Sequence, residues 1–426
     1  GKGCRKNQRW YLGLVIAGLR LASEPIRRMT RFRALLPRAA GARRRERVRA
    51  RRVQVRLDVA HAALAQVDQV ERRGRAPVPA AQPARDRVKR LQKPHAYKGR
   101  EGTASETPPS FPGPTFLARN GEPTVLRYDN KTSVETSPHL HGDHGPAHSD
   151  GYPDFYTLQG KKRDYYYPNI APRQNATPDV AFPATVEEAG EFDVSHVPTT
   201  MWIHDHAMDV TGFNVNRGLA AFYLCEDDVE IDHQMSGRLP KMYGDFDHVI
   251  ALKDFAFNSD GTLKYDFLDH NGHLGDVFTA NGRVQPYMEV YRKKYRFRIL
   301  NACNARYLHL RLNSSTGKNQ KDGLPFLLIG KDTWEVGEAT NMDSFTISPG
   351  ERFDVIIDFS QLPEDVDTYY LQNIMHQTDG RKPKGIRPKK ESRPWLQFRL
   401  LDGDPPGPQE AEGVEHGEFT TSEGHE

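Results

Sequence analysis

The sequence predicts an all-β protein built of tandem β-sandwiches. Two observations support this fold class. Short segments rich in β-branched and aromatic residues recur at turn-marked intervals after residue 108, and few stretches show helical periodicity. Strands at this spacing are typical of sandwiches, whereas a parallel α/β fold alternates strands with helices. The clearest predicted strands are Phe116–Tyr128, Ala220–Leu224, Tyr295–Leu300, Arg306–Leu312 and Phe353–Phe359.

Two of these segments show the period of two that a strand with one solvated face requires. Tyr295–Ile299 alternates apolar and polar residues, and Tyr307–Leu312 does so in part. The intervening Asn301–Ala305 contains residues that favour turns. The sequence therefore predicts that these two strands form a hairpin.

Proline residues and changes in composition divide the chain into four segments. Pro108, Pro109, Pro112 and Pro114 mark the start of the strand-rich region. At the usual size of roughly 100–150 residues per domain, this region holds two sandwich domains. We predict an Arg-rich extension at 1–107, a first domain at 108–235, a second domain at 236–405 and an acidic, disordered tail at 406–426.

The net charge of +4 conceals two parts of opposite sign. Residues 1–100 hold 28 Lys and Arg against 6 Asp and Glu, whereas the other 326 residues hold 32 basic and 50 acidic residues. A nucleic-acid-binding arm would interleave aromatic residues with its arginines, and few occur here. A secretory signal would place a longer apolar core than Leu12–Ala17 after the first basic residues. We therefore interpret 1–107 as a poorly ordered extension or an unreliable start of the reading frame, and expect no nucleic-acid partner.

Composition also excludes several classes of protein. No segment approaches the ~20 apolar residues that a membrane helix needs. The longest candidate, Leu12–Ala22, is interrupted by Arg20, so we expect no membrane partner. Three cysteines, Cys4, Cys225 and Cys303, are too few for a disulfide scaffold or a four-cysteine metal site. Cys225 and Cys303 remain either buried thiols or a disulfide.

Two short strings, Pro138–His144 and Met201–Met208, carry the candidate chemistry. Each contains a His-x-His pair in a strand-like context, and residues two apart on a strand share one face. The predicted metal ligands are His139, His141, His204 and His206.

The spacing of each pair bears on the number of metal ions. Two strand rises separate the ring bases by roughly 6.6 Å, which is wide for one ion but suits two neighbouring ions. Imidazole ligands favour copper, zinc, iron or nickel over calcium and magnesium. Gly142, directly after the first pair, removes a side chain where the backbone passes close to another group.

One enzyme class that fits the first string is the di-zinc metallo-β-lactamase-type hydrolase. His139, His141, Asp143 and His144 match its His-x-His-x-Asp-His pattern, in which two zinc ions would generate hydroxide. That motif normally follows a buried apolar strand, whereas the polar Glu135–Pro138 precedes it here. The expected alternation of strands and helices is also missing, so this hydrolase is the less favoured interpretation.

A second class matches motifs along most of the chain. In chain order, these motifs are Pro112–Phe116, His139–Gly142, Ser149–Pro153, Tyr165–Asn169, Trp202–Met208, Gly275–Asp276, Asn281–Gly282, Gln285–Tyr287, Tyr295–Asn301 and Pro349–Phe359. Together and in this order they resemble the motifs of multicopper oxidases, and most closely the branch that contains spore-coat laccases, bilirubin oxidases and phenoxazinone synthases. The resemblance covers roughly residues 108–402.

The resemblance implies tandem cupredoxin-like Greek-key β-sandwiches and a role for each histidine. His139 would bind the lone type 2 copper and His141 one of the paired type 3 coppers, while His204 and His206 would serve the type 3 pair. Asp150 would deliver protons near the cluster, a role that suits a carboxylate beside copper. The alternative for Asp150 is a turn residue in a Ser-Asp-Gly loop.

Two motifs of the family do not occur in these 426 residues. One is His-Pro-x-His-x-His, and the other is a His-Cys-His string followed by a further His and an axial ligand. No cysteine follows Cys303, and the histidines after Phe359 are His376, His416 and His425. Because these motifs supply the type 1 copper and four cluster ligands, we expect the chain to represent the first two domains of a three-domain oxidase. We expect it to be inactive alone.

The resemblance implies a copper oxidoreductase that couples oxidation of phenolic, aromatic amine or bilirubin-like substrates to reduction of dioxygen to water. Its partners would be dioxygen and a small aromatic reductant. The alternative is a non-catalytic cupredoxin-type copper-holding or structural protein. Sequons at Asn130, Asn175 and Asn313, together with the usual export of the family, favour a secreted or extracytoplasmic location.

Overall fold

The computed structural model describes residues 51–57, 96–97, 111–171, 199–268, 271–314, 324–386 and 392–405. Val48–Glu426 form one compact unit. The predicted acidic tail lies outside the described residues, and so does the Arg-rich extension apart from two strands. None of the described helices is long and apolar enough to cross a membrane.

The first group of strands forms two sheets that pack face to face. One sheet has the order β1 (Arg51–Leu57), β4 (Thr124–Asn130), β6 (Lys162–Tyr167). The other has the order β2 (Ala96–Tyr97), β3 (Thr115–Arg119), β8 (Ala220–Glu226), β7 (Thr200–Asp205), β5 (Pro138–His141). Leu126 and Tyr165 of the first sheet share a buried cluster with Leu140, Ile203 and Tyr223 of the second. Burial of these apolar side chains holds the two sheets together as a sandwich.

Two strands lie within the segment that the sequence analysis assigns to a poorly ordered extension. β1 pairs in parallel with β4, and β2 pairs in parallel with β3. The sequence of β1 alternates three apolar residues, Val53, Val55 and Leu57, with polar residues. This period of two is a local strand signal that the overall arginine content conceals.

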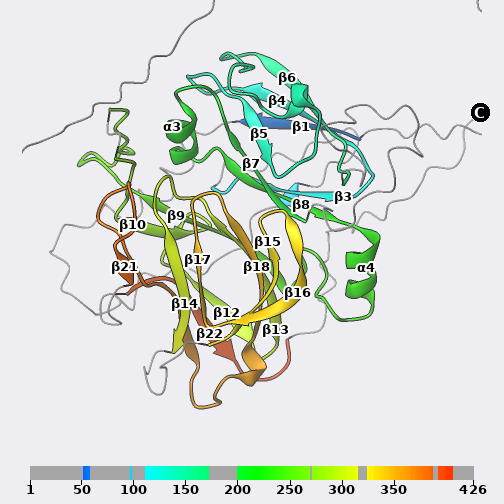
Figure 1. Cartoon of the computed structure of the whole chain (residues 1–426), viewed down its shortest axis with the longest axis vertical. Helices are drawn as coiled ribbons and strands as arrows, with labels where there is room; N and C mark the ends of the chain where they lie inside the picture. Colours follow the sequence, from blue (N-terminus) through cyan, green and yellow to red (C-terminus); the bar gives the residue numbers. More distant parts are fainter. Residues whose placement is uncertain are drawn as a thin grey trace, which may run out of the picture. The chain divides into compact units, whose positions relative to one another are not determined.

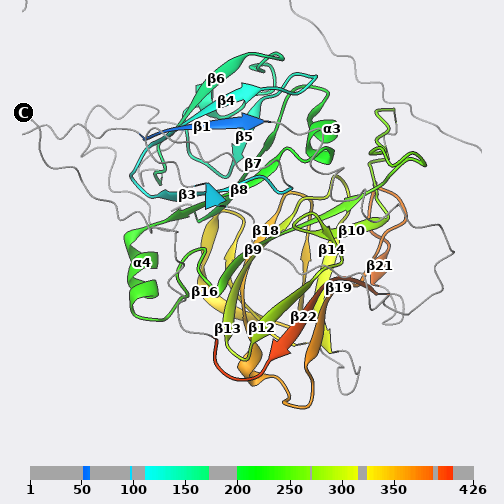
Figure 2. The same ribbon diagram turned by 180° about the vertical axis from the view of Figure 1, so that it is seen from behind.

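The second group of strands forms a larger sandwich (Figure 1). Its seven-stranded sheet has the order β11 (Arg283–Val284), β10 (Val277–Ala280), β9 (Asp247–Phe255), β13 (Lys294–Asn301), β18 (Arg352–Asp358), β15 (Phe326–Lys331), β16 (Trp334–Met342). Its five-stranded sheet, seen from behind in Figure 2, has the order β12 (Tyr287–Tyr291), β22 (Arg393–Leu401), β19 (Thr368–Asn373), β14 (Leu308–Ser314), β17 (Ser344–Ile347). Phe297 and Val355 of the first sheet and Leu310 and Phe398 of the second lie in one buried cluster.

The remaining elements are short. β20 (Met375–His376) and β21 (Gly385–Ile386) pair with each other. The α-helices in the described ranges are α3 (Thr211–Asn216) and α4 (Asp228–Met235), and η1 (Ala147–Ser149) and η3 (Phe359–Gln361) are 3₁₀ turns. Asp227 caps α4 by accepting a hydrogen bond from the Glu230 amide at 2.8 Å. The predicted all-β class is confirmed, and the strand–helix alternation of a metallo-β-lactamase-type hydrolase does not occur in the part of the chain described here.

The predicted hairpin between the strands at Tyr295 and Tyr307 is wrong. β13 pairs with β9 and β18, whereas β14 pairs with β17 and β19 in the opposite sheet. Asn301 explains the change of sheet, because its amide donates to the Arg306 carbonyl at 2.8 Å and to the Ile347 carbonyl at 2.9 Å. The turn signal was therefore real, but it directs the chain across the sandwich.

The outer face of β7 and β8 packs against the second sandwich. Phe222 and Leu224 share a buried cluster with Val249, Phe255 and Leu300 of β9 and β13. The residues that alternate with these along β7 and β8 face the interior of the first sandwich, as the period of a strand requires. Strand β7 is thus buried on both faces, and every residue from Thr200 to Asp205 is buried.

A buried network of charges fastens the same region. Arg298 donates from Nε and Nη2 to the Asp247 carboxylate, with a shortest distance of 2.9 Å. It donates one bond each to Glu230 at 3.0 Å and to the Thr200 hydroxyl at 3.0 Å. Arg296 donates to Asp354 and Glu230, each at 2.6 Å. The arginines lower the pKa of Glu230 and Asp247 against the opposing effect of burial. Residues of α4, β7, β9, β13 and β18 meet in this one network.

Removal of one member of the network should destabilise the protein strongly. We expect Arg298→Met to lower the free energy of unfolding by about 3–5 kcal/mol, because it leaves buried carboxylates without their partner. Urea denaturation measures the change. Arg119→Met is the matched control, since Arg119 and Asp228 form an ion pair at 2.6 Å with both side chains largely exposed. The control should change stability by no more than about 1 kcal/mol. Equal effects of the two substitutions would contradict this account.

Candidate metal centre

The register of β5 against β7 places the predicted ligands on one face. The two strands are antiparallel, with His139 opposite His204 and His141 opposite Trp202. Residues directly opposite in such a pair project to the same side of the sheet. His206 follows β7, two positions after His204, and its amide donates to the Ser137 carbonyl at 2.9 Å, which continues the pairing. The structure therefore brings all four imidazoles together.

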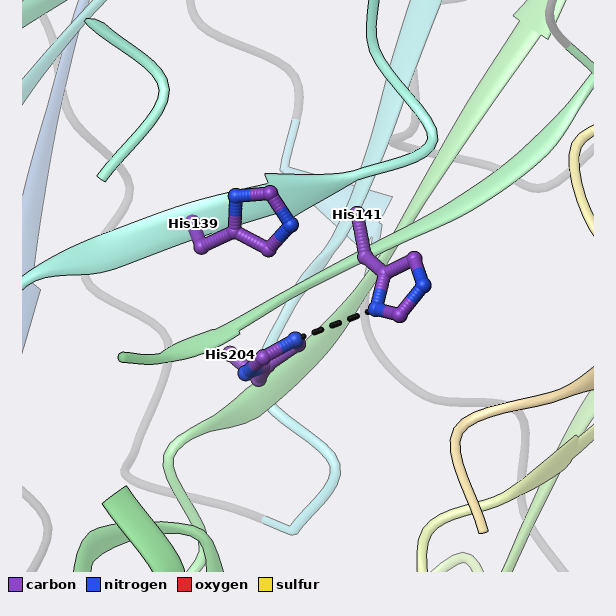
Figure 3. A group of neighbouring side chains, drawn as sticks. All are labelled: His139, His141 and His204. Atoms are coloured by element: carbon purple, nitrogen blue, oxygen red, sulfur yellow. Dashed lines mark hydrogen bonds between the residues drawn. The ribbon is translucent and has the colours of Figure 1, made fainter. Parts of the chain in front are cut away.

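The four rings form a close cluster. The ring centroid of His139 lies 5.5 Å from that of His141, 5.2 Å from that of His204 and 5.3 Å from that of His206. The centroid of His204 lies 5.4 Å from that of His141 and 5.7 Å from that of His206. One ring nitrogen from each of His139, His141 and His204 lies within 4.8 Å of the others. Figure 3 shows these three side chains on their strands. This separation suits neighbouring ions that share a pocket.

Backbone carbonyls fix two of the rings. The Nδ1–H of His139 donates to the Asp150 carbonyl at 2.5 Å, and the Nδ1–H of His204 donates to the Asp205 carbonyl at 2.8 Å. Each bond leaves Nε2 of that ring as the free electron-pair donor, an arrangement common among metal-binding histidines. His141 differs, because its Nδ1–H donates to His204 Nε2 at 3.2 Å.

Burial keeps the imidazoles uncharged. Desolvation, followed by the charge of Arg352, lowers the pKa of His141 to about 3. Desolvation also lowers the pKa of His204 well below its ordinary value, and it lowers that of His139 despite the opposing effect of Asp150. Neutral imidazoles are the form that binds metal ions. The cluster is thus prepared for a cation at neutral pH.

These shifts predict a pH dependence of stability in the metal-free protein. Because the folded pKa of His141 lies below the ordinary 6.5, the unfolded chain binds its proton first as the pH falls, and folding is destabilised between about pH 6.5 and pH 4. Relative to His141→Gln, the wild type should lose about 1–2 kcal/mol more on going from pH 7 to pH 5. Asp143, whose pKa burial raises to about 7, has the opposite dependence, so the difference between the two proteins is the quantity to measure. Denaturation with a chelator present provides it, and identical pH profiles would refute the prediction.

Asp150 lies beside His139. It ends the η1 turn, and besides its carbonyl it brings a carboxylate oxygen to 3.4 Å from His139 Nδ1. The carboxylate is about half exposed. Gly151 allows this approach, because a Cβ there would lie 2.3 Å from the Pro138 carbonyl and because its φ is +81°. Asp150 is therefore placed between His139 and solvent.

Asp205 lies on the face opposite its flanking histidines and is buried. Its carboxylate accepts bonds from the Ser137 amide at 2.8 Å, the Ala207 amide at 3.1 Å and the Asn214 side chain at 3.0 Å. These bonds fix the backbone directly before β5, at Ser137, and shortly after β7, at Ala207. Asp205 is therefore not a surface residue.

Other residues near the motifs lie in varied places. Trp202 is buried and stacks on His141 with ring centroids 5.8 Å apart, whereas Met208 is about half exposed. His144 is exposed between β5 and η1, and His148 is exposed within η1. Cys225 and Cys303 are both buried free thiols, so of the two alternatives the structure shows thiols and not a disulfide.

Two of the three sequons lie in described ranges, and neither offers an exposed asparagine. Asn130 is buried, and its amide donates to the Val134 and Thr157 carbonyls at 2.8 Å each. Asn313 is buried and donates to Gln372 at 2.7 Å. The structure gives these asparagines internal partners and does not support their glycosylation in the folded protein.

The sequence analysis missed two residues that contact the ligand strands from the second sandwich. Thr333 lies in the turn between β15 and β16, and Arg352 begins β18. A Cβ on Gly142 would lie 1.8 Å from the Thr333 hydroxyl, which identifies the close approach that this glycine was predicted to permit. Arg352 belongs to a motif that the sequence analysis quoted, but its partners on β5 and β7 lie more than 140 positions away in the chain.

The comparisons with known proteins agree with this architecture. A family model described as multicopper oxidase matches residues 249–387. A laccase from Bacillus stratosphericus is 34% identical over 347 residues, which are 69% of this chain and 62% of that protein. The multicopper oxidase McoA from Aquifex aeolicus superposes with a TM-score of 0.55 at 27% identity, covering 68% of this chain and 55% of that one. The chain belongs to the multicopper oxidase family.

Membership confirms the tandem cupredoxin-like sandwiches and excludes the di-zinc hydrolase. A bilirubin oxidase from Albifimbria verrucaria is 33% identical over 249 residues, 58% of this chain and 38% of that protein. The chain thus spans less than two thirds of the length of each of these curated relatives.

The family implies copper, and the residues present fit it. Imidazole nitrogens are ligands that copper favours. His141 Nδ1 and His204 Nε2 are 3.2 Å apart, close to the separation of two nitrogens held roughly 2.0–2.1 Å from one ion. His206 Nδ1 is buried and has no hydrogen-bond partner in the described part of the chain. The donor set and its neutral charge state therefore match a copper site built from imidazoles.

Proposed function

We propose that this chain supplies half of the copper cluster of an oxidase that couples oxidation of phenols, aromatic amines or bilirubin-like pigments to reduction of dioxygen to water. The observation that supports the proposal is the convergence of four imidazoles from two paired strands on one face. The relatives named laccase and bilirubin oxidase support the choice of substrates.

Each ligand has a role in the proposal. His139 Nε2 would bind the lone copper, and His141, His204 and His206 would bind the copper pair. Copper bound there would accept electrons and pass them to dioxygen. The carbonyls of Asp150 and Asp205 hold the rings of His139 and His204 in the tautomer that leaves Nε2 free. When metal binds at His141 Nδ1, the proton on that nitrogen must move to Nε2 or leave the ring.

Asp150 transfers protons between solvent and the cluster in this proposal. Its carboxylate is half exposed and lies 3.4 Å from a nitrogen of His139, so one side faces water and the other the ligands. Reduction of dioxygen consumes protons, and a carboxylate in this position can relay them.

The second candidate is a copper-holding protein without oxidase activity. Its support is that the 426 residues contain no His-Cys-His string, so a type 1 site is not provided by this chain. Both candidates predict copper binding by the same imidazoles. They differ in whether oxidation of an aromatic substrate occurs when the remaining family motifs are supplied.

Copper titration tests the site directly. We expect the purified chain to bind Cu(II) with nitrogen superhyperfine structure in its EPR spectrum, and His204→Ala to weaken binding by at least about tenfold. His309→Ala is the control, because His309 lies in the second domain and bonds to Thr346 and Ser344 hydroxyls at 2.8 and 3.0 Å. A wild-type chain that binds no copper would disprove the proposed function. Oxygen uptake with a phenolic substrate should be absent from this chain alone, since electrons have no type 1 entry site.

Asp150→Asn separates the two contacts that Asp150 makes. The substitution removes the carboxylate but keeps the backbone carbonyl that holds His139. We expect Cu(II) affinity to change by no more than about threefold, because the carbonyl and not the carboxylate fixes the ring. If copper is lost from Asp150→Asn, the carboxylate is a structural support or ligand, and its assignment to proton transfer is incorrect.

A further inference from the structure

The turn between β15 and β16 reaches the two strands that carry the ligands. Thr333 is 1% exposed, and its carbonyl accepts bonds from the Thr199 amide at 2.8 Å and the Thr199 hydroxyl at 2.9 Å. Thr199 directly precedes β7. On its other side, Thr333 lies against Gly142 at the end of β5, where a Cβ would clash. This residue of the second domain therefore touches both ligand strands.

Arg352 connects the same three segments through one guanidinium group. Its Nη2 donates to the Thr333 hydroxyl at 2.8 Å and to the His141 carbonyl at 3.4 Å, and its Nε donates to the Thr200 carbonyl at 3.3 Å. Its Nη1 donates to the Gly350 carbonyl at 3.0 Å. The side chain is 2% exposed. Arginine suits this position because its planar fork presents five donors in fixed directions.

The partners of Arg352 distinguish it from the other buried arginines of the second domain. Arg296 and Arg298 each form a two-point bond with a carboxylate. The nearest carboxylate oxygen to Arg352, from Asp332, is 3.4 Å away, and most of its bonds go to neutral oxygens. A buried charge held chiefly by neutral oxygens carries a desolvation cost that these bonds offset only in part.

His141 lacks the backbone-carbonyl support that holds two of the other ligand rings. His139 and His204 donate Nδ1–H to backbone carbonyls, but the partner of His141 is another ligand ring. The orientation of His141 therefore depends on its backbone and on packing. A Cβ on Gly350 would lie 3.8 Å from His141 Cε1 and 3.7 Å from the ring of Trp202, so the segment leading into β18 also packs beside this ring.

We infer that Arg352 is a positioning residue through which the second domain sets the orientation of His141, and hence the geometry of the copper site. Arg352 touches no metal in this arrangement and acts through the His141 carbonyl, the Thr200 carbonyl and Thr333. The inference rests on the proposed copper site. It gives the second domain a part in metal binding although that domain contributes none of the four imidazoles.

The test compares Arg352→Met with a control of similar burial. Arg306→Met removes a guanidinium that bonds to Asp254 at 2.8 Å and to the Gly275 carbonyl at 2.6 Å, and none of these partners lies on β5 or β7. Cu(II) affinity by chelator competition, the EPR spectrum of bound Cu(II) and the melting temperature of the metal-free chain are measured for each variant well below its melting temperature. Thr333→Val removes only the hydroxyl acceptor and covers the case in which Arg352→Met does not fold.

We expect Arg352→Met to bind Cu(II) about 10- to 100-fold more weakly, with altered copper hyperfine splitting, as for loss of an outer support of a metal ligand. Thr333→Val should show the same spectral change with a smaller loss of affinity. Arg306→Met should lower the melting temperature but keep the wild-type affinity and spectrum. Unchanged binding in both Arg352→Met and Thr333→Val, or an equal loss in Arg306→Met, would overturn the inference. Failure of the wild type to bind copper would instead overturn the proposed function.

Discussion

Strand β7 begins within a network of buried charges that belongs mainly to the second domain. The Thr200 hydroxyl accepts from Arg298, and the Thr200 carbonyl accepts from Arg352, so the start of the strand is held at two atoms. Removing a charge from water is unfavourable unless several well-placed partners compensate it. The network therefore tolerates few displacements of β7, and His204 occupies the position that this constraint determines.

A second constraint acts on the imidazoles of His139, His141 and His204. Desolvation opposes their protonation, so at neutral pH these three rings lie together without repelling one another. In the metal-free protein, hydrogen bonds to backbone carbonyls already fix the tautomer of His139 and of His204. A site prepared in this way needs little rearrangement when it binds a cation, and the proton on His141 Nδ1 is the main group that must move.

The two sandwiches have different roles. The first provides the ligands from one pair of strands, and the second supports these strands through Arg298, Thr333 and Arg352. This division explains why residues of the second domain are buried and charged where the first domain meets them. Asn301 supports the change of sheet after β13, because its side-chain amide donates to the Arg306 and Ile347 carbonyls.

The sequence by itself determined the features that depend on near neighbours along the chain. The His-x-His spacing fixed a shared face for each pair because strands have a period of two, and Gly142 marked a close approach before its partner was known. The family motifs indicated copper chemistry and tandem sandwiches. Tertiary structure alone decided which strands became neighbours, so the chain at Asn301–Ala305 crosses between sheets where a hairpin was expected. It also decided that Asn130 and Asn313 are buried and that Met208 is exposed. It also brought Arg352 to His141, because pairing across 211 positions depends on the packing of whole sheets and leaves no periodic trace in the sequence.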